Sequence, residues 1–323
     1  MRTPVCDLLG IDVPIVLAPF GPWQQLELAA AVSSAGGLGS VGTALRRVDE
    51  LRAEWARMRE LTDKPFAVNH TGRPFDEGVF EAILEARPPA ISFHIGLPRE
   101  RIAEAHDAGI LWIQQVGDLR SAELALEAGA DVLVAQGWEA GGNAGWVGTM
   151  VLVPQVVDAA GDVPVLAAGG IGDGRGLAAA LTLGAQGAVL GTRFLASVEM
   201  GIDPTWKERI LTADATDAVK VVNSARVMPP VTLELPPGTP PAPRALRTPL
   251  IERLEADPDS VDPAEVGPTL VAEVRASRGH DLLPFTGQSA ALVHDVVPAA
   301  EIVSRLLAEA RAALASAAGS DRA

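Results

Sequence analysis

The feature that most limits how this chain can fold is a regular alternation of short apolar runs with segments of helical spacing. Eight runs rich in Val, Ile, Leu and Ala lie between residues 14 and 190, and helix-like segments separate them. Such an alternation is typical of a parallel sheet with crossover helices. Eight strands also close a (β/α)8 TIM barrel, whose active sites lie on the loops after the strands. We therefore expect an α/β barrel, with a doubly wound open sheet as the alternative.

The apolar runs predict strands at Pro14–Ala18, Leu38–Val41, Pro65–Val68, Ala90–Phe93, Leu111–Gln115, Val132–Ala135, Val165–Ala167 and Gly187–Leu190. Helical spacing predicts helices at Gln24–Ala35, Val48–Leu61, Asp76–Ala86, Pro98–Asp107, Leu119–Ala128, Val151–Ala160 and Leu177–Leu183. After the first strand the chain continues as APFGPW, whereas a Rossmann sheet usually carries GxGxxG there. The missing fingerprint favours the barrel.

The alternation ends after Phe194. Residues 199–284 contain helix-like pieces and a proline-rich section, Pro229–Pro249, and this stretch is too long for one barrel loop. We expect a mostly helical lid or substrate domain with an extended proline-rich arm, and a linker without a catalytic role is the alternative. A long amphipathic helix predicted at Val296–Ala317 would complete the barrel wall. The expected division is a barrel of residues 1–198 and 285–318, the insertion 199–284 and a tail 319–323.

Charge and cysteine content exclude several classes of function. The net charge of −15 argues against nucleic-acid binding and against docking on anionic membranes. Cys6 is the only cysteine, so no disulfide can form within the chain, and a cytoplasmic location is expected. No apolar run approaches the about 20 residues of a membrane span, and no signal-peptide pattern opens the chain. The five histidines have no metal-ligand spacing, so no metal site is predicted.

The stretch Val132–Thr149, VLVAQGWEAGGNAGWVGT, predicts a functional loop directly after a buried strand. Its glycines, including Gly141 and Gly142, let backbone approach a ligand closely, and a flexible surface connection is the alternative. The groups in it that could bind a ligand or react are Gln136, Glu139 and Asn143. We interpret Glu139 first as holding the loop backbone.

Two later loops have the composition of a phosphate-binding cradle. AAGGIGDG follows the seventh expected strand and LGTRF follows the eighth, and TIM barrels commonly bind phosphate between these loops. The candidate residues are Gly169, Gly170, Gly191 and Thr192, with Arg193 either paired to the phosphate or facing solvent. A flat aromatic ligand would then lie across the ends of earlier strands, against Ala18, Pro19, Phe20 and Asn69. Asn69 would bond a polar ring edge, or alternatively act as a cap or turn residue.

Taken together, these motifs resemble the nitronate monooxygenase family, whose members are FMN-dependent barrels related to flavin enoyl reductases of fatty-acid synthesis. The matching pieces are PIVLAPF (Pro14–Phe20), SSAGGLGSVG (Ser33–Gly42), FAVN (Phe66–Asn69), ISFHIG (Ile91–Gly96), AQGWEAGG (Ala135–Gly142), VLAAGGIGDG (Val165–Gly174), AVLGTRF (Ala188–Phe194) and GQSA (Gly287–Ala290). Residues 203–283 match only loosely. No single piece is specific, whereas the ordered set is.

The resemblance implies a bound FMN in the barrel, with the insertion covering the substrate side of the flavin. The implied FMN contacts are Asn69, Gln136, Gly141, Gly170, Val189, Leu190, Gly191 and Thr192. They coincide with the loops chosen above from glycine content and strand position.

One position departs from the family. The family motif normally ends in EAGGH, and its histidine is taken as the catalytic base or a substrate contact, whereas this chain has EAGGN with Asn143. Asparagine cannot act as a general base near neutral pH, but it can donate a hydrogen bond. His70 and His94, at the ends of the third and fourth strands, are the candidate replacements, with purely structural histidines as the alternative.

Three tryptophans lie in loops at the catalytic end. Trp23, Trp138 and Trp146 are candidates for lining a substrate cavity, with ordinary packing as the alternative.

Three functions remain open on these grounds. The leading hypothesis is oxidation of alkyl nitronates with O2 through FMN, because a preformed nitronate needs no base to remove a carbon proton. The first alternative is an NAD(P)H-dependent flavin reductase of an enoyl or enone substrate, including CoA- or ACP-linked ones. The second is a barrel that binds flavin or a phosphate ligand without redox turnover. The expected partners are a small-molecule substrate and O2 or NAD(P)H, and assembly as a homodimer is left open.

Overall fold

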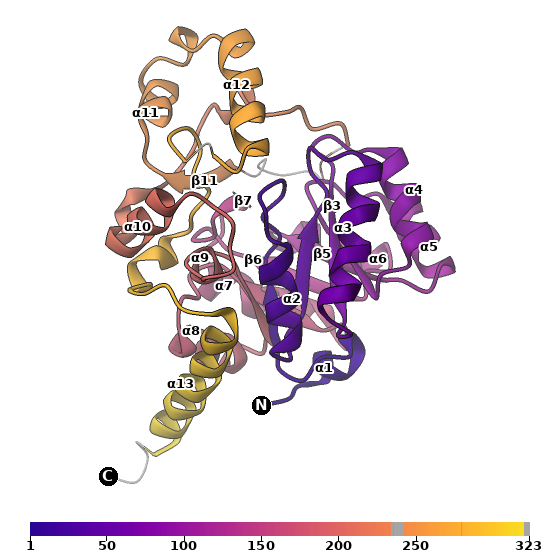
Figure 1. Ribbon diagram of the computed structural model, residues 1–323. Coiled ribbons are helices and arrows are strands. Elements are labelled where there is room, and N and C mark those ends of the chain that lie inside the picture. The colour runs from indigo at the N-terminus through magenta and orange to yellow at the C-terminus, as the bar shows by residue number, and fades with distance from the viewer. Residues whose placement is uncertain (234, 236–241, 279, 320–323) are drawn as a thin grey trace.

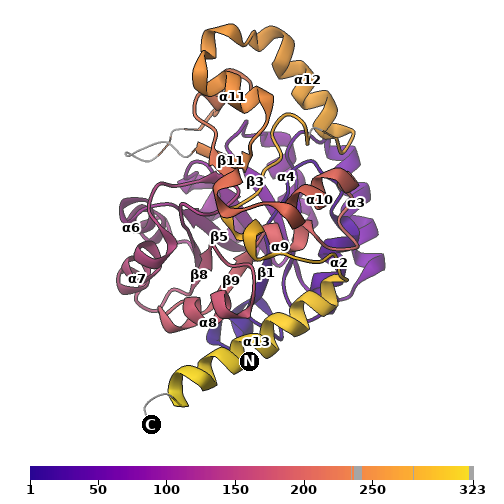
Figure 2. The same ribbon diagram turned by 90° about the vertical axis from the view of Figure 1, so that its left-hand side faces the viewer.

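A computed structural model describes residues 1–233, 235, 242–278 and 280–319 of the chain. Eight parallel strands form a ring in the order β1-β9-β8-β6-β5-β4-β3-β2 (Figure 1, Figure 2). Their bounds are β1 Ile15–Leu17, β2 Gly39–Gly42, β3 Phe66–Thr71, β4 Ala90–His94, β5 Leu111–Val116, β6 Val132–Gln136, β8 Val165–Ala168 and β9 Gly187–Leu190. The ring closes between β1 and β2, where Leu38 N donates to Ile15 O at 3.0 Å and Leu17 N donates to Leu38 O at 2.9 Å. The predicted TIM barrel is confirmed.

Helices on the outside connect consecutive strands. They are α2 Leu26–Ser34, α3 Val48–Leu61, α4 Glu77–Ala86, α5 Arg99–Asp107, α6 Leu119–Glu127, α7 Thr149–Ala160 and α8 Gly174–Thr182. Aspartate side chains accept hydrogen bonds from first-turn N–H groups at the starts of α4, α6 and α8, as N-caps do. The buried positions of α3 are Leu51, Trp55 and Met58, at helical spacing, which is why sequence periodicity located this helix correctly.

A short N-terminal helix, α1 (Pro4–Leu9), covers the N-terminal end of the barrel. Val5, Cys6 and Leu9 are buried there and pack in one cluster with barrel-interior side chains such as Val132 and Leu166. Figure 1 and Figure 2 both place α1 at the opposite end of the molecule from α11 and α12 of the insertion. The barrel interior is therefore filled at one end, and its other end faces the insertion.

The insertion begins after α9 (Thr192–Leu195) and contains α10 (Pro204–Thr212), α11 (Pro249–Ala256) and α12 (Pro263–Arg275). It also contains two strands, β10 (Ala218–Lys220) and β11 (Ala242–Leu246), which were not expected in a mostly helical segment. Together with β7 (Gly142–Ala144) of the glycine loop they form an antiparallel sheet in the order β10-β11-β7. Short 3-10 turns η1 (Ala215–Asp217), η2 (Ser224–Arg226) and η3 (Pro258–Ser260) also belong to the insertion, and η4 (Gln288–Leu292) follows it.

The proline-rich section Pro229–Pro249 therefore differs from an extended arm. Residues 234 and 236–241 of it lie outside the described part of the chain, but its end forms the central strand β11. Proline lacks an N–H and is normally kept out of central strands, which is why the sequence pattern did not predict this one. In the structure Pro243 uses its carbonyl, which accepts from Val221 N at 2.8 Å.

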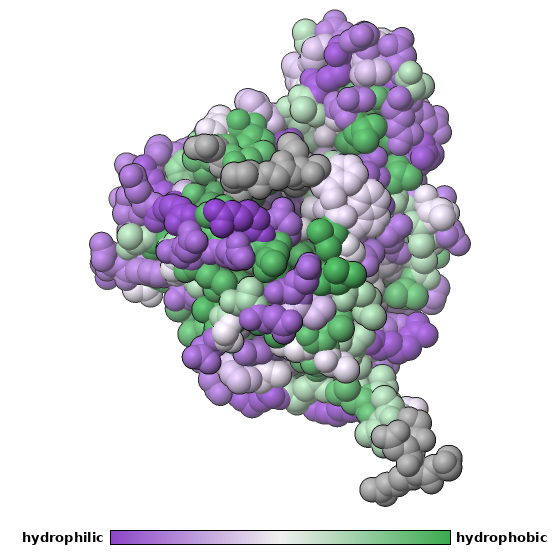
Figure 3. All heavy atoms as spheres, turned by 180° about the vertical axis from the view of Figure 1, so that it is seen from behind, coloured by the Kyte–Doolittle hydropathy of each residue, from purple (hydrophilic) through white to green (hydrophobic). Residues whose placement is uncertain are grey.

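The last helix, α13 (Ala299–Gly319), packs against α8 and α2 on the outside of the barrel. It begins three residues later than predicted, and residues 320–323 of the expected tail lie outside the described residues. Seen from behind, the lobe that contains α11 and α12 is mostly hydrophilic, whereas hydrophobic patches lie lower on the barrel (Figure 3). Among the described residues, no helix combines the length and the apolar character needed to cross a membrane.

Gly174 opens α8 at a point where α13 passes very close. A Cβ on Gly174 would overlap the Glu309 Cβ and would lie 2.5 Å from Ala310 N. We expect Gly174→Ala to lower the free energy of unfolding by about 1–3 kcal/mol, because packed atoms must shift. The control is Gly78→Ala in α4, whose Cβ would meet nothing nearer than 3.5 Å and where alanine favours the helix. Urea unfolding measures both, and equal stability of the two variants would contradict the expectation.

Candidate active site

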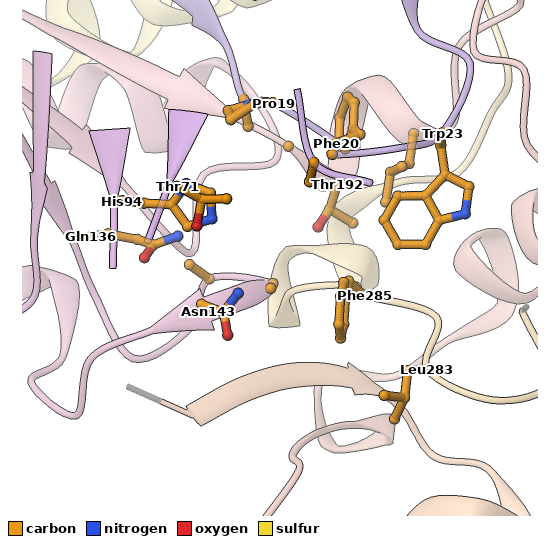
Figure 4. A pocket seen from close by; sticks show the side chains of 18 of the residues that line it. Pro19, Phe20, Trp23, Thr71, His94, Gln136, Asn143, Thr192, Leu283 and Phe285 are labelled. Carbon is orange, nitrogen blue, oxygen red and sulfur yellow. The ribbon is translucent and has the colours of Figure 1, made fainter. Parts of the chain in front are cut away.

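A cavity lies at the C-terminal ends of the barrel strands, under the insertion (Figure 4). Its volume is about 230 Å³, counted as the space that the centres of water-sized molecules can occupy. A single water needs about 10–15 Å³ on the same scale. The cavity is therefore large enough for an organic ligand. It also lies where TIM barrels carry their active sites.

Strand alternation decides which side chains face this cavity. In β3, Ala67 belongs to the barrel interior, so Asn69 and Thr71 lie on the same inner side. Thr71 lines the cavity and pairs with His94 at the end of β4, which also lines it. Asn69 lies one layer deeper, where its Nδ2 donates to Ser92 O at 2.9 Å.

His70 lies on the outer side of β3 and does not line the cavity. Its ring contacts the rings of Phe75, Phe80 and Phe93, and its Nδ1 is 2.8 Å from Thr43 Oγ1. Burial lowers the pKa of His70 to about 4, so the side chain is neutral at physiological pH. The structure thus places His70 in the packing layer between sheet and helices, whereas the sequence suggested the mouth of the strand.

Four polar side-chain atoms of the cavity residues have no hydrogen-bond partner among the described residues: Arg73 Nε, His94 Nδ1, Gln136 Oε1 and Asn143 Oδ1. Buried polar groups are nearly always satisfied, so their joint presence on one wall indicates a missing polar ligand. Burial, with His70 and Arg73 adding to it, lowers the pKa of His94 to about 4. His94 is therefore neutral and only weakly basic.

Asn143 lies on an ordered strand, not on a flexible connection. It pairs with Pro243 of β11, and its carbonyl accepts from Gln115 Nε2 at 3.1 Å. Gly142, one residue earlier, has φ +65°, a conformation that favours glycine. The insertion therefore fixes the backbone of the residue that replaces the expected histidine.

A buried lysine of the insertion reinforces this pairing. Lys220 Nζ donates to Ala144 O at 2.7 Å, to Gly145 O at 2.9 Å and to Ala242 O at 2.9 Å. Burial, with Arg244 adding to it, lowers the pKa of Lys220 to about 7. The ammonium group joins three backbone carbonyls of β7, its following loop and β11.

Arg244 is the second buried cation in this region. It donates to Trp138 O at 2.9 and 3.0 Å and also to Ala218 O. The rings of Trp138 and Trp146 pack with centroids 5.0 Å apart, and Lys220 Nζ lies 5.3 Å from each. These two tryptophans therefore surround a cation behind the loop and do not line the cavity.

Glu139 holds the backbone of its own loop, as expected. Its carboxylate accepts from Thr149 N at 3.0 Å and from Thr149 Oγ1 at 2.8 Å, at the start of α7. Thr149 Oγ1 also lies 3.2 Å from Gly169 O. The contact ties the loop after β6 to the loop after β8.

The residues predicted to form a phosphate cradle lie in the loops after β8 and β9. Gly169 and Gly170 have φ +101° and +71°, and both line the cavity together with Gly191 and Thr192. Thr192 Oγ1 accepts from Gly287 N at 2.9 Å, which leaves its hydroxyl proton free to donate to a ligand. Arg193 neither faces solvent nor points into the cradle, because it is buried and its Nη2 pairs with Asp295 at 2.9 Å.

Aromatic and aliphatic side chains form the side of the cavity toward the insertion. Trp23 contacts Trp206 at 5.3 Å and Phe285 at 5.8 Å between ring centroids, both edge-on. Leu270 of α12 and Leu283 also line this side. The wall is apolar and is supplied jointly by the loop after β1 and by the insertion.

The structure brings most of the sequence candidates to one cavity wall. Those that line it are Ala18, Pro19, Phe20, Trp23, His94, Gln136, Gly141, Gly142, Asn143, Gly169, Gly170, Val189, Gly191 and Thr192. Those that do not are Asn69, His70, Trp138, Trp146 and Leu190.

Sequence reasoning missed several residues of the wall, notably Thr71, Arg73, Gln115, Trp206 and Phe285. Strand alternation would have found both Thr71 and Gln115, because Thr71 lies four residues after inward-facing Ala67 and Gln115 lies two residues after inward-facing Ile113. Trp206 and Phe285 come from segments whose path over the barrel had no sequence signal.

Comparison with known proteins agrees with this geometry. The nitronate monooxygenase family model matches residues 2–74 and 70–309. The chain is 37% identical over 259 residues to the (3aS,4S,5R,7aS)-5-hydroxy-7a-methyl-1-oxo-octahydro-1H-indene-4-carboxyl-CoA dehydrogenase of Mycobacterium tuberculosis, covering 79% of this chain and 69% of that protein. It is 33% identical over 355 residues to nitronate monooxygenase of Paraburkholderia phytofirmans, covering 93% and 92%. The solved structure of FabK from Thermotoga maritima superposes with a TM-score of 0.88 at 35% identity, covering 99% of each chain.

Fold and site thus define an oxidoreductase built on a TIM barrel with its cavity at the C-terminal strand ends. The chain belongs to the nitronate monooxygenase family.

The buried histidines make stability depend on pH. The pKa of about 4 for His70 and His94 lies below the ordinary value of 6.5, so the unfolded chain binds protons more readily between these values. We expect stability to be complete above about pH 6.5 and to fall as the pH drops toward 4. His70 alone would contribute a loss on the order of 3 kcal/mol.

Urea unfolding of the parent and of His70→Phe at pH 7.5 and pH 5 checks this expectation. Phenylalanine suits the surrounding aromatic cluster and cannot be protonated, so His70→Phe should lose less stability on acidification than the parent. His294→Asn, at an exposed histidine, is the surface control and should behave like the parent. If His70→Phe and the parent lost the same free energy of unfolding between pH 7.5 and pH 5, the lowered pKa assigned to His70 would be contradicted.

Proposed function

We propose that this protein is an FMN-dependent oxidoreductase whose preferred substrate is an already ionised alkyl nitronate, with O2 as the electron acceptor. The observation that carries the proposal is Asn143 on the cavity wall, beside a neutral His94, in place of a titratable base. The acidic chain with its single, buried Cys6 is consistent with a cytoplasmic enzyme acting on small molecules.

The residues present fit FMN. Gly169, Gly170, Gly191 and Thr192 would hold its phosphate, because glycines with positive φ expose backbone N–H groups in a cavity wall. Ala18 and Pro19 would lie against the ring, and the unpartnered Gln136 Oε1 would accept from a ring N–H. FMN supplies the two-electron redox chemistry when bound.

The remaining work falls to the protein side chains. The Asn143 amide can orient an oxyanion by donating from Nδ2, but it cannot take a proton from carbon. His94 is a weak base because its pKa is about 4. The apolar wall of Trp23, Trp206 and Phe285 would exclude water from the reacting groups. These properties suit a substrate that arrives deprotonated.

A second function, reduction of a conjugated double bond in an acyl thioester by NAD(P)H, is favoured by the same apolar wall. Leu270, Leu283 and Phe285 offer a surface for a substrate body larger than a small nitroalkane. The name of the Mycobacterium tuberculosis CoA dehydrogenase refers to a CoA-linked substrate in that protein.

The purified protein distinguishes these functions by its absorbance. We expect a flavin spectrum that is bleached without oxygen by propyl 2-nitronate and not by NADH or NADPH, and oxygen consumption with the nitronate. Rapid bleaching by NADH or NADPH alone would overturn the proposal in favour of the reductase. A protein that stays colourless with added FMN would overturn both and leave a binding barrel without redox turnover.

Position 143 can be tested by restoring a base. We expect Asn143→His to raise turnover of neutral 2-nitropropane by about 10- to 100-fold, because a general base then faces the reacting carbon. Turnover of the preformed nitronate should change little. Asn143→Ala is the matched control, since it removes the amide without adding a base. Equal gains in both variants, or no gain with histidine, would show that residue 143 does not reach the substrate.

A further inference from the structure

The charge on the cavity wall is opposite in sign to that of the whole chain. The net charge of the protein is −15, yet the described residues of the wall include no Asp or Glu, and Arg73 is the one permanently charged side chain among them. The buried Nε of Arg73 has no hydrogen-bond partner among the described residues. Its Nη1 lies 3.6 Å from Met228 Sδ, a weak acceptor.

We propose that Arg73 forms an anion-binding subsite that holds the negatively charged group of the substrate, while the insertion holds an apolar substrate body. The inference rests on the proposed function in so far as this cavity is the substrate site. It names the substrate class as an amphipathic anion, such as a nitronate or carboxylate that carries a hydrocarbon chain or ring.

The phosphate cradle cannot provide the anion for Arg73. Arg73 follows β3, whereas Gly169 and Gly170 follow β8. In the ring order β1-β9-β8-β6-β5-β4-β3-β2, β3 and β8 are four places apart, so they lie on opposite sides of the barrel. A phosphate held at Gly169 and Gly170 would therefore not pair with the guanidinium, which has no counter-charge among the described residues.

The backbone around Arg73 is fixed before any ligand binds. Gly72 O accepts from Thr232 N at 2.9 Å, and Phe75 N donates to Thr232 Oγ1 at 2.8 Å. Both contacts come from the insertion and flank Arg73 on either side. A group held in place in this way loses little freedom on binding, which favours affinity and discrimination.

The electrostatic surroundings also favour an incoming anion. Burial lowers the pKa of Arg73, but a guanidinium stays charged in proteins, so its desolvation is offset only when a counter-charge arrives. His94 lines the same cavity and has an unpartnered Nδ1, so it can make a hydrogen bond to the same ligand group. A planar guanidinium also matches the paired oxygens of a nitronate or carboxylate.

The apolar part of the ligand has its own surface. Leu270, Val271 and Val274 of α12 line the cavity together with Met228, whose sulfur touches Arg73. Met228 and α12 of the insertion thus place the hydrophobic surface directly beside the guanidinium of Arg73. A small hydrophilic anion would satisfy Arg73 but would leave this surface uncovered.

Binding can be measured without turnover, because Trp23 and Trp206 line the cavity and report on ligands by fluorescence. The probes are hexanoate and hexanamide, which share shape and differ in charge, titrated into the purified protein as isolated. We expect the parent to prefer hexanoate. Arg73→Met should weaken hexanoate about tenfold while hexanamide changes less than about twofold, and Arg73→Lys should retain most of the preference.

Arg57→Met on the exposed face of α3 is the control and should behave like the parent. The proposal is overturned if the parent does not distinguish the two probes, or if both weaken equally in Arg73→Met. It is also overturned if Arg73→Met lowers FMN content while the probe preference persists, because the anion would then belong to the cofactor. A protein that binds no FMN would end the proposed function, yet the probe comparison would still decide the role of Arg73.

Discussion

The pairing of β7 with β11 is the contact on which the arrangement of this site depends. Two cations, Lys220 and Arg244, are buried beside it and are satisfied by backbone carbonyls. Burying an ammonium group without a carboxylate is costly unless several oriented dipoles replace its water. Carbonyls from the barrel loop and from the insertion meet that need together, so neither segment keeps its geometry without the other. The insertion therefore contributes directly to the cavity wall and to the backbone that carries Asn143.

This dependence explains how a glycine-rich loop can hold a reactive position. Glycines at 141 and 142 allow close approach of backbone, but they also make the loop flexible in the unfolded chain. Strand pairing, the Lys220 contacts and the bond from Gln115 remove that freedom. The amide of Asn143 consequently faces the cavity from a fixed backbone, as preorganised groups in active sites do.

Much of the barrel could be predicted from sequence because its strands are short, apolar and regularly spaced, and because its helices carry caps such as Asp118. The glycines that line the cavity could be found for the same reason, because they directly follow predicted strands. Three features could not be predicted from the sequence. His70 and Ala67 must point to opposite faces of β3 because side chains alternate along a strand. The sequence alone did not show which of the two faces points into the barrel. Strand β11 contains Pro243, which argues locally against a strand. Lys220 and Arg73 lie in segments without a motif, and only the three-dimensional path brings them to the site.

The helix α1 under the barrel has a consequence for the order of events during turnover. Val5, Cys6 and Leu9 fill the N-terminal end of the barrel, and the cavity has its mouth at the other end, beside the insertion. A cofactor bound deep in that mouth would be covered by the substrate that binds after it. A bulky second reactant such as a nicotinamide nucleotide would reach the cofactor only after the first product had departed. The architecture therefore favours reactants that occupy the cavity in turn rather than together.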